Sequence, residues 1–214
     1  MSYGTWAWGE KKSLHDSQRD TPRVKRLRKA FIVRIAQEFS PWLKHLKFID
    51  ESGVHLGLTR LYGRASSAQR VVEATPGHSG TNYTLIAALS WQGVQAAWIL
   101  PGAMDREAFD VYVEQVLAPI LRPGDIVLLD NLSSHTGPRT RQLVEAKKAR
   151  LVLLPPYSSD FNPIELCWSK VKLALRAAKA RTFESLLQAL ADAFSSVSHA
   201  DIDAWFAHCG FLKP

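Results

Sequence analysis

The stretch DIVLLDNLSSH, residues 125–135, decides the fold of this 214-residue chain. Four consecutive aliphatic residues, Ile126–Leu129, precede Asp130, and such an uninterrupted run is typical of a strand buried on both faces. A helical pattern at about 139–149 and a second apolar strand, Arg150–Leu154, follow. This β-α-β alternation predicts two parallel strands, with Asp130 at the carboxyl end of the first.

The first half of the chain predicts an antiparallel meander. Apolar and aromatic residues indicate strands at 46–50, 55–60, 83–90 and 94–100. Residues 74–104 carry no charged side chain, but Pro and Gly interrupt them repeatedly, so they predict two strands joined by a turn rather than a membrane-spanning helix. The two halves together predict an α/β fold whose mixed sheet has three antiparallel and two parallel strands flanked by helices.

Helical periodicity predicts the elements that flank this sheet. We expect helices at Arg19–Trp42 (ended by Pro41), at 105–121, at about 163–180 and at 182–197. A short apolar-aromatic tail with Trp205, Phe206 and Phe211 then ends the chain.

Positive charge gathers in two parts of the sequence. The net charge is +7 and the pI about 9.5. Residues 10–50 carry 11 Lys and Arg against 5 Asp and Glu, and residues 139–181 carry 10 against 3. Most charge runs are solvated surface. An asymmetry of this size also favours a polyanionic partner such as DNA.

Three acidic residues stand at ends of these elements: Asp50 in FIDESG (48–53), Asp130, and Glu165 in PPYSSDFNPIELCWSKVK (155–172). Between the second and the third lie 34 residues. Each aspartate has a plain alternative role as a turn former after a strand. Yet catalytic acids of α/β sheets sit at such strand ends, and three carboxylates suit a pair of divalent metal ions that cut phosphodiesters.

Glu165 also has an alternative role as a helix cap. In Asn162-Pro163-Ile164-Glu165, asparagine at the N-cap and glutamate three positions on predict a capping box. The rest of the helix favours more than a cap, because cations recur on the face of Glu165, beside an apolar stripe. The stripe comprises Ile164, Trp168, Val171, Leu175 and Ala178, and the cations, expected to bind DNA, are Lys172, Arg176 and Lys179.

Other reaction classes lack their motifs. There is no GxSxG nucleophile motif and no phosphate-binding P-loop. The two cysteines, Cys167 and Cys209, match no metal or redox spacing, which favours reduced thiols in the cytoplasm. No N-terminal signal-peptide pattern is present.

The three motifs FIDESG, LLDNLSSH and PPYSSDFNPIELCW, with LTRLYGRA at 58–65, resemble the DDE catalytic domain of bacterial insertion-sequence transposases of the mariner superfamily, the IS-six-thirty type. The resemblance runs from about Lys11 to the C-terminus and implies an RNase H-like fold. It implies that Asp50, Asp130 and Glu165 bind two Mg²⁺ ions, with Mn²⁺ as a substitute. The positions that accompany this triad are Glu51, Asn131, His135 and Asn162. For His135 a hydrogen bond at a helix entry is an equal alternative, and Glu51 is either a metal ligand or a neighbour of one.

The resemblance also implies partners and a domain division. We expect a basic helical arm at 1–45, a catalytic domain at 46–214, double-stranded DNA as substrate, a homodimer on that DNA and a nucleoid-associated location. Ser159 replaces the proline common in the family. The helix-turn-helix region of relatives has no counterpart here, so we expect a separate helix-turn-helix subunit or a frameshift-fused N-terminal half.

The resulting hypothesis is a metal-dependent DNA endonuclease that also transfers strands: it hydrolyses phosphodiesters at element ends and joins the freed ends to target DNA. One alternative is a truncated, inactive DNA-binding remnant or partner subunit that lacks end recognition. Another is a different RNase H-like nuclease, such as a resolvase or a hybrid-cleaving enzyme, although the Asn-Pro-Ile-Glu motif disfavours it.

Overall fold

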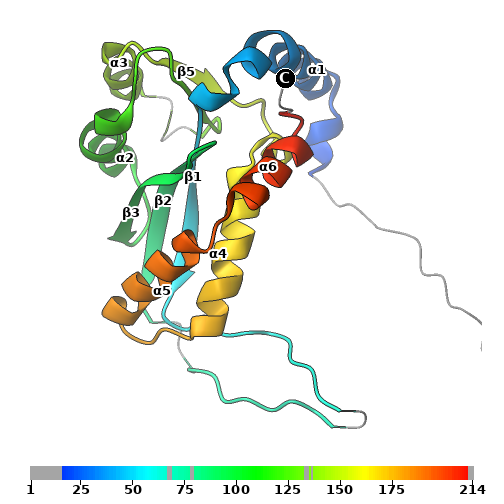
Figure 1. Ribbon diagram of the computed structural model, residues 1–214, viewed down its shortest axis with the longest axis vertical. Coiled ribbons are helices and arrows are strands. Elements are labelled where there is room, and N and C mark those ends of the chain that lie inside the picture. Colours follow the sequence, from blue (N-terminus) through cyan, green and yellow to red (C-terminus); the bar gives the residue numbers. More distant parts are fainter. Residues whose placement is uncertain (1–15, 67–68, 78–79, 133–134, 136, 212–214) are drawn as a thin grey trace, which may run out of the picture.

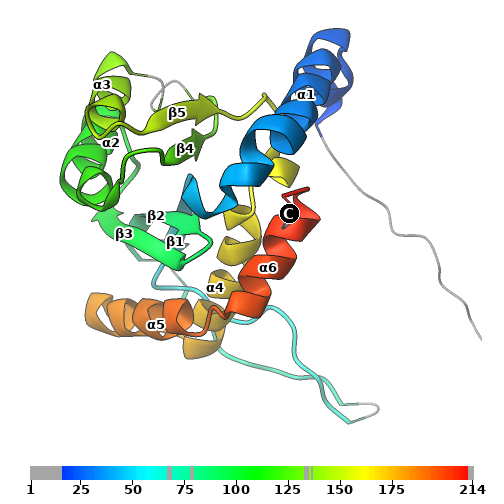
Figure 2. The same ribbon diagram turned by 45° about the horizontal axis from the view of Figure 1, so that its top comes forward.

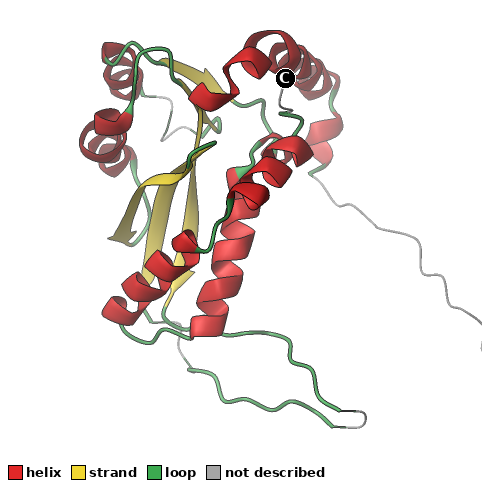
Figure 3. Ribbon diagram, viewed as in Figure 1, coloured by secondary structure: helices red, strands yellow, loops and turns green. Residues whose placement is uncertain are grey.

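The computed structural model describes residues 16–66, 69–77, 80–132, 135 and 137–211. Its centre is one five-stranded sheet in the order β3-β2-β1-β4-β5 (Figures 1 and 3). The strands are β1 (Leu46–His55), β2 (Asn82–Ser90), β3 (Gly93–Pro101), β4 (Ile126–Leu129) and β5 (Arg150–Leu153). The first three pair antiparallel, whereas β4 runs parallel to both β1 and β5. The predicted mixed α/β sheet is therefore confirmed.

Helices cover both faces of this sheet. They are α1 (Pro22–Arg34), α2 (Arg106–Tyr112), α3 (Pro138–Ala146), α4 (Ile164–Ala178), α5 (Phe183–Ser195) and α6 (His199–His208). Figure 2 shows α2 and α3 on one side of the sheet and α1, α4, α5 and α6 on the other. Within the described part of the chain, no helix combines the length and the hydropathy that a membrane crossing needs.

Side chains alternate between two cores on either side of the sheet. Phe48 faces the α4–α6 side, where its ring meets those of Phe206 at 5.4 Å and Phe211 at 5.0 Å. Its neighbour Ile49 faces the other side and packs in the same cluster as Phe109 of α2. This period of two leaves β1 and β4 with almost no solvent-facing side chain, as the apolar run of β4 predicts.

The N-terminal helix differs from its predicted bounds. Thr21 caps α1 by accepting the Val24 N–H, so the helix begins at Pro22 rather than Arg19. The helical path continues through a π-helical turn (Ile35–Phe39) into a 3₁₀ segment (Ser40–His45), and non-helical backbone angles break it at Trp42, directly after Pro41, as predicted. Phe39 and Leu43 pack in the same core as Phe48, and the domain boundary at residue 45 stays a prediction.

The strand predicted at 55–60 is wrong. Strand β1 continues unbroken to His55, and the chain then turns, with the Gly57 N–H donating to the His55 ring. The Arg181 guanidinium donates hydrogen bonds to the backbone carbonyls of Leu56 and Leu58, which therefore do not pair with a neighbouring strand. Beyond them the chain makes a long excursion away from the body of the molecule before returning to β2 (Figure 1).

The tail predicted after residue 197 is largely a helix. Ser198 caps α6 in a capping box with Asp201, whose side chain also pairs with Lys170 of α4 at 2.6 Å. This helix places Phe206 against β1. The serine and aspartate three residues apart were its signal in the sequence.

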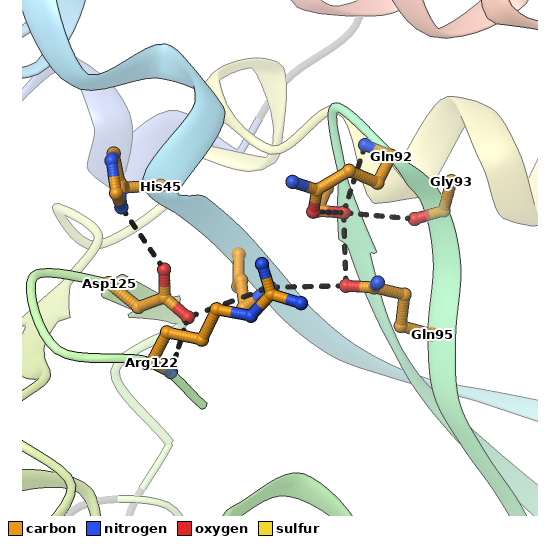
Figure 4. A network of polar contacts seen from close by, with 8 residues as sticks. His45, Gln92, Gly93, Gln95, Arg122 and Asp125 are labelled. Carbon is orange, nitrogen blue, oxygen red and sulfur yellow. Dashed lines mark hydrogen bonds and ion pairs between the residues drawn. The ribbon is translucent and has the colours of Figure 1, made fainter. Parts of the chain in front are cut away.

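A buried polar network fixes the register of β1 against β4 at their amino-terminal ends (Figure 4). Lys47 of β1, about 5% exposed, lies 3.7 Å from the Asp125 carboxylate and donates to Gln95 at 3.1 Å. Asp125, which directly precedes β4, also contacts the ring of His45 and accepts the Arg122 N–H. Removing either partner of such a buried pair leaves an uncompensated charge, so the network opposes slippage of the two strands.

Candidate active site

Strand register brings the first two predicted acids together. Leu46 pairs with Ile126 and Phe48 with Leu128, a constant offset of 80 residues. The same offset places Asp50 level with Asp130, which follows the last residue of β4. Adjacent strands lie about 4.8 Å apart, so the two carboxylates start from neighbouring backbone positions.

The third acid, Glu165, stands in the first turn of α4 and faces the same hollow. This hollow has a volume of about 430 Å³. Its lining residues are Asp50, Asp130, Asn131, Leu132, Leu154, Pro155, Pro156, Tyr157, Ser158, Ser159, Asn162 and Glu165. The structure therefore gathers all three acids around one hollow, together with two of the four accompanying residues.

The capping box predicted at Glu165 is absent. Helix α4 begins at Ile164 with Pro163 at its N-cap and no capping side chain. The Glu165 N–H donates to the backbone carbonyl of Asn162, and the Asn162 side chain, in a residue 3% exposed, leaves its Oδ1 without a hydrogen-bond partner. The Glu165 carboxylate is thus free of the capping role that was its main alternative.

Asp50 is held by the helix that carries Glu165. The indole Nε1–H of Trp168, one turn further along α4, donates to Asp50 Oδ2 at 3.1 Å. Burial, together with the charges of Glu165 and Asp130, raises the pKa of Asp50 to about 7, against the opposing hydrogen bonds of Glu51 N–H and Trp168. Burial also raises the pKa of Glu165, which Lys172 lowers and Asp130 raises. These mutual effects are those of acids that share one site.

His135 links two further acids. Its Nδ1 lies 2.5 Å from Asp130 Oδ1 and its Nε2 lies 2.8 Å from Glu51 Oε1, while its ring packs 4.3 Å from that of Phe109. Burial disfavours its charged form, but the two carboxylates raise the pKa of His135 to about 9. Both ring nitrogens contact these acids, which favours the role beside the triad over the helix-entry alternative.

The predicted cations divide between two places. Lys172 and Arg176 line a second hollow, of about 390 Å³, which shares Asp50 and Glu165 with the first. Lys179 instead pairs with Glu73, in a separate hollow near Arg60 at the far end of α4. The reason is the end of the helix: Lys179 is its C-cap in the left-handed conformation, so it leaves the face predicted from helical spacing. Ala178 is exposed and does not continue the buried stripe.

The donor set suits a hard divalent cation. In the described part of the chain, no three His, Cys, Asp or Glu side chains lie close enough together to hold a metal ion as they stand. An open carboxylate set is what Mg²⁺ uses when water and substrate phosphate complete its shell. Nearby negative charges raise the pKa of Asp50, and the buried Asn162 oxygen has no hydrogen-bond donor. The site thus has negative charge and a polar oxygen that a bound cation or its water would satisfy.

Comparison with known proteins agrees with this geometry. A profile described as DDE superfamily endonuclease matches residues 45–187, two thirds of the sequence. The chain belongs to the DDE superfamily endonucleases. A search of curated proteins found no significant match.

Solved structures resemble this DDE endonuclease in fold. It superposes on the pre-cleavage Mos1 transpososome with a TM-score of 0.70 at 18% identity, covering 99% of this chain and 63% of the Mos1 chain. The Mos1 mariner paired-end complex with Mn gives 0.68 at 18% identity, over 99% of this chain and 63% of that one. The Mos1 catalytic domain alone gives 0.65 at 16% identity, over 94% and 91%. The chain therefore spans less than two thirds of the Mos1 transposase chains in the DNA complexes, and the bacterial IS-six-thirty assignment stays a prediction.

Sequence reasoning missed the groups that hold the loop before α4. Arg28 of α1 grips Asp160 with two hydrogen bonds, of 2.9 and 2.6 Å, donates to Ser158 Oγ at 2.7 Å and stacks 4.3 Å from the ring centre of Phe161. Nothing in the spacing of Arg28 distinguishes it from the other cations of α1. The indole bond of Trp168 was also missed, because a tryptophan in an apolar stripe predicts only packing.

Proposed function

We propose that this DDE endonuclease is the catalytic domain of a transposase that cuts double-stranded DNA at element ends and joins the freed 3′-hydroxyl to target DNA. The observation that carries the proposal is the strand register that sets Asp50 level with Asp130, with Glu165 on the same hollow. Mos1 structures similar to this chain include complexes with Mg and with Mn, which supports a divalent cofactor.

Asp50, Asp130 and Glu165 would hold the metal, in our proposal two Mg²⁺ ions with Mn²⁺ as a substitute. When bound, the ions supply Lewis-acid activation of water or of a 3′-hydroxyl and neutralise phosphate charge. The chain itself provides the remaining functions. Trp168 orients Asp50, His135 holds Asp130, and Asn131 and Asn162 offer polar groups at the edge of the hollow.

Lys172 and Arg176 extend the site along α4 and would bind DNA phosphates. Such phosphate contacts give affinity that does not depend on the DNA sequence. Lys179 would contribute only after leaving Glu73. A homodimer on DNA and a helix-turn-helix subunit or fused N-terminal half are further parts of this proposal, as is a cytoplasmic location. The excursion after β1 exposes Leu61 (78%), Tyr62 (92%) and Val72 (86%), an apolar surface that supports a protein partner.

The test is nicking of a supercoiled plasmid by the purified chain with Mg²⁺ or Mn²⁺. Asp130→Asn retains the shape of the side chain and should abolish cutting; circular dichroism should show that the fold is kept, although loss of the charge beside His135 lowers the thermal unfolding midpoint. Asp110→Asn, on α2 outside the hollow, is the control for an aspartate-to-asparagine change. Undiminished nicking by Asp130→Asn would exclude this site. A junction and an RNA–DNA hybrid, offered in parallel, test the resolvase and hybrid-cleaving alternatives.

A further inference from the structure

We infer that Glu51 is a positioning residue that acts through His135 to fix the Asp130 carboxylate, which deepens the proposed function and rests on it. Glu51 is next to Asp50 on β1, yet its Oε1 is engaged by His135 Nε2 at 2.8 Å. The opposite ring nitrogen of His135 lies 2.5 Å from Asp130 Oδ1. The imidazole thus ties a residue of β1 to the acid at the end of β4.

The ring has little freedom to turn. The His135 side chain is 2% exposed, and one face packs against Phe109, which is fully buried in the core beneath the sheet. If Glu51 were absent, Nε2 would be buried without an acceptor, and the ring could satisfy itself only by tilting away from Asp130. Glu51 therefore determines the direction in which the His135 ring nitrogens point, whereas Phe109 restricts the tilt of the ring.

The relay fixes the carboxylate that Asp130 presents to the hollow. Asp130 Oδ1 accepts from both His135 and the Leu132 N–H, at 2.5 and 3.2 Å. The Asp130 side chain is 35% exposed and lines the hollow. Fixing Oδ1 holds the carboxylate in one orientation, which is the way outer-shell partners orient metal-binding carboxylates.

Glu51 also lines the second hollow beside Asp50 and Glu165, so a pair of variants is needed to separate this role from direct metal ligation. A glutamate that ligates metal needs its negative charge, whereas a glutamate that only accepts from His135 is replaceable by glutamine, whose amide oxygen also accepts. The contrast between Glu51→Gln and Glu51→Ala therefore distinguishes the two. Since the Glu51 side chain is 22% exposed, both variants are expected to fold.

Nicking kinetics with these two variants test the relay. Glu51→Ala should lower kcat by about 10-fold or more and should raise the Mg²⁺ concentration for half-maximal rate by a similar factor, because loss of an outer-shell partner has effects of this size. The KM for DNA should stay unchanged. Glu51→Gln should largely restore both kcat and the Mg²⁺ requirement. Glu114→Ala, which removes an exposed acid of the π-helical turn after α2 (Val113–Leu117) that pairs with Arg139 of α3, is the matched control and should behave as the parent.

A second measurement needs no activity. In the metal-free protein, ¹⁵N-edited spectra should show both ring N–H protons of His135 protected from solvent, with the Nε2 proton lost in Glu51→Ala and retained in Glu51→Gln. A Glu51→Gln variant as impaired as Glu51→Ala, or a Glu51→Ala variant with parental kcat and metal requirement, would overturn the relay. Protected ring protons in a parent protein that never cuts DNA would support the relay and refute the proposed function instead.

Discussion

Trp168 of α4 donates its indole N–H to Asp50 in the middle of β1, at 3.1 Å. The bond joins the helix that carries Glu165 to the strand that carries Asp50, so two of the three acids are held by one contact between elements 118 residues apart in sequence.

Trp168→Phe keeps an aromatic ring in the core but removes this bond and part of the buried ring volume. We expect the free energy of unfolding to fall by at least about 1.5–3 kcal/mol, the usual contribution of a hydrogen bond to a charged group, because the lost volume adds to the loss of the bond. Denaturant titration at pH 8 measures it. Trp42→Phe, at a half-exposed position, is the control. A Trp168→Phe protein as stable as the parent would show that the bond contributes nothing.

Cation binding should depend on pH through Asp50. Its pKa in the folded protein, about 7, lies above the ordinary value of 3.8, so the metal-free protein loses stability as pH rises through about 7. A divalent cation offsets the charge that then appears, whereas at lower pH a proton competes with it. Mg²⁺ or Mn²⁺ should therefore raise the thermal midpoint more at pH 8 than at pH 6, as calorimetry can measure. In Asp50→Asn this pH dependence should largely disappear; equal midpoint shifts at both pH values in the parent would contradict the assignment.

Arg28→Lys should loosen the loop that leads to Glu165. Lysine retains the charge but cannot hold Asp160 with two parallel bonds and Ser158 with a third, so we expect a loss of about 1–2 kcal/mol at pH 7. Burial alone would raise the pKa of Asp160, but Arg28 and Arg19 outweigh burial and lower this pKa below 3.8 in the folded protein. The carboxylate's contribution is thus present above that value and lost as pH falls through the folded pKa.

The stability difference between the parent and Arg28→Lys should accordingly narrow in strong acid, which denaturation at pH 7 and near pH 3 tests. Arg26→Lys, an exposed change on the same helix, should have no effect at either pH. A difference that stays constant with pH would show that the arginine acts through Ser158 and Phe161 and not through Asp160.

Removing Lys172 and Arg176 together should weaken DNA binding and its dependence on salt. If each contacts one phosphate, the slope of log K against log salt should become shallower by about 1.8 for duplex DNA. Fluorescence anisotropy over a salt series measures the slope. Lys44→Ala/Lys147→Ala removes two exposed cations away from the hollow and should leave it unchanged. A slope unaltered by the first pair would place the DNA elsewhere.

Much of this architecture follows from local pattern. The apolar run before Asp130 has a strand's length and no polar interruption, which is why both the strand and its burial were predictable. The register of β1 against β4 was not predictable from local pattern, because it depends on which residues of two distant segments pair with each other. A shared metal site of Asp50 and Asp130 therefore followed from the resemblance and not from register, and the paired strands now provide its geometry.

The errors have physical causes of the same kind. Residues 55–60 alternate as a strand would, but Arg181 captures their carbonyls. Asn162 and Glu165 have capping-box spacing, yet Pro163 takes the N-cap position and the asparagine side chain is buried elsewhere. Lys179 fits helical spacing only as long as the helix lasts. A distant partner, a neighbouring proline or the end of a helix overrides the local signal in these cases.

The buried Lys47–Asp125 pair lies close to the acids in the sequence of both strands: Lys47 stands three residues before Asp50, and Asp125 five residues before Asp130. A one-residue slip of β1 past β4 would turn every side chain of β1 to the other face, so this ion pair also bears on whether Asp50 and Asp130 arrive level. Substitution of Lys47 or Asp125 would shift the acids relative to one another. Such a variant could keep its helices and sheet and still fail to cut DNA. Loss of cutting in a mutational survey thus does not by itself assign a residue to the hollow, since part of the catalytic alignment is set by lysine and aspartate side chains that no substrate touches.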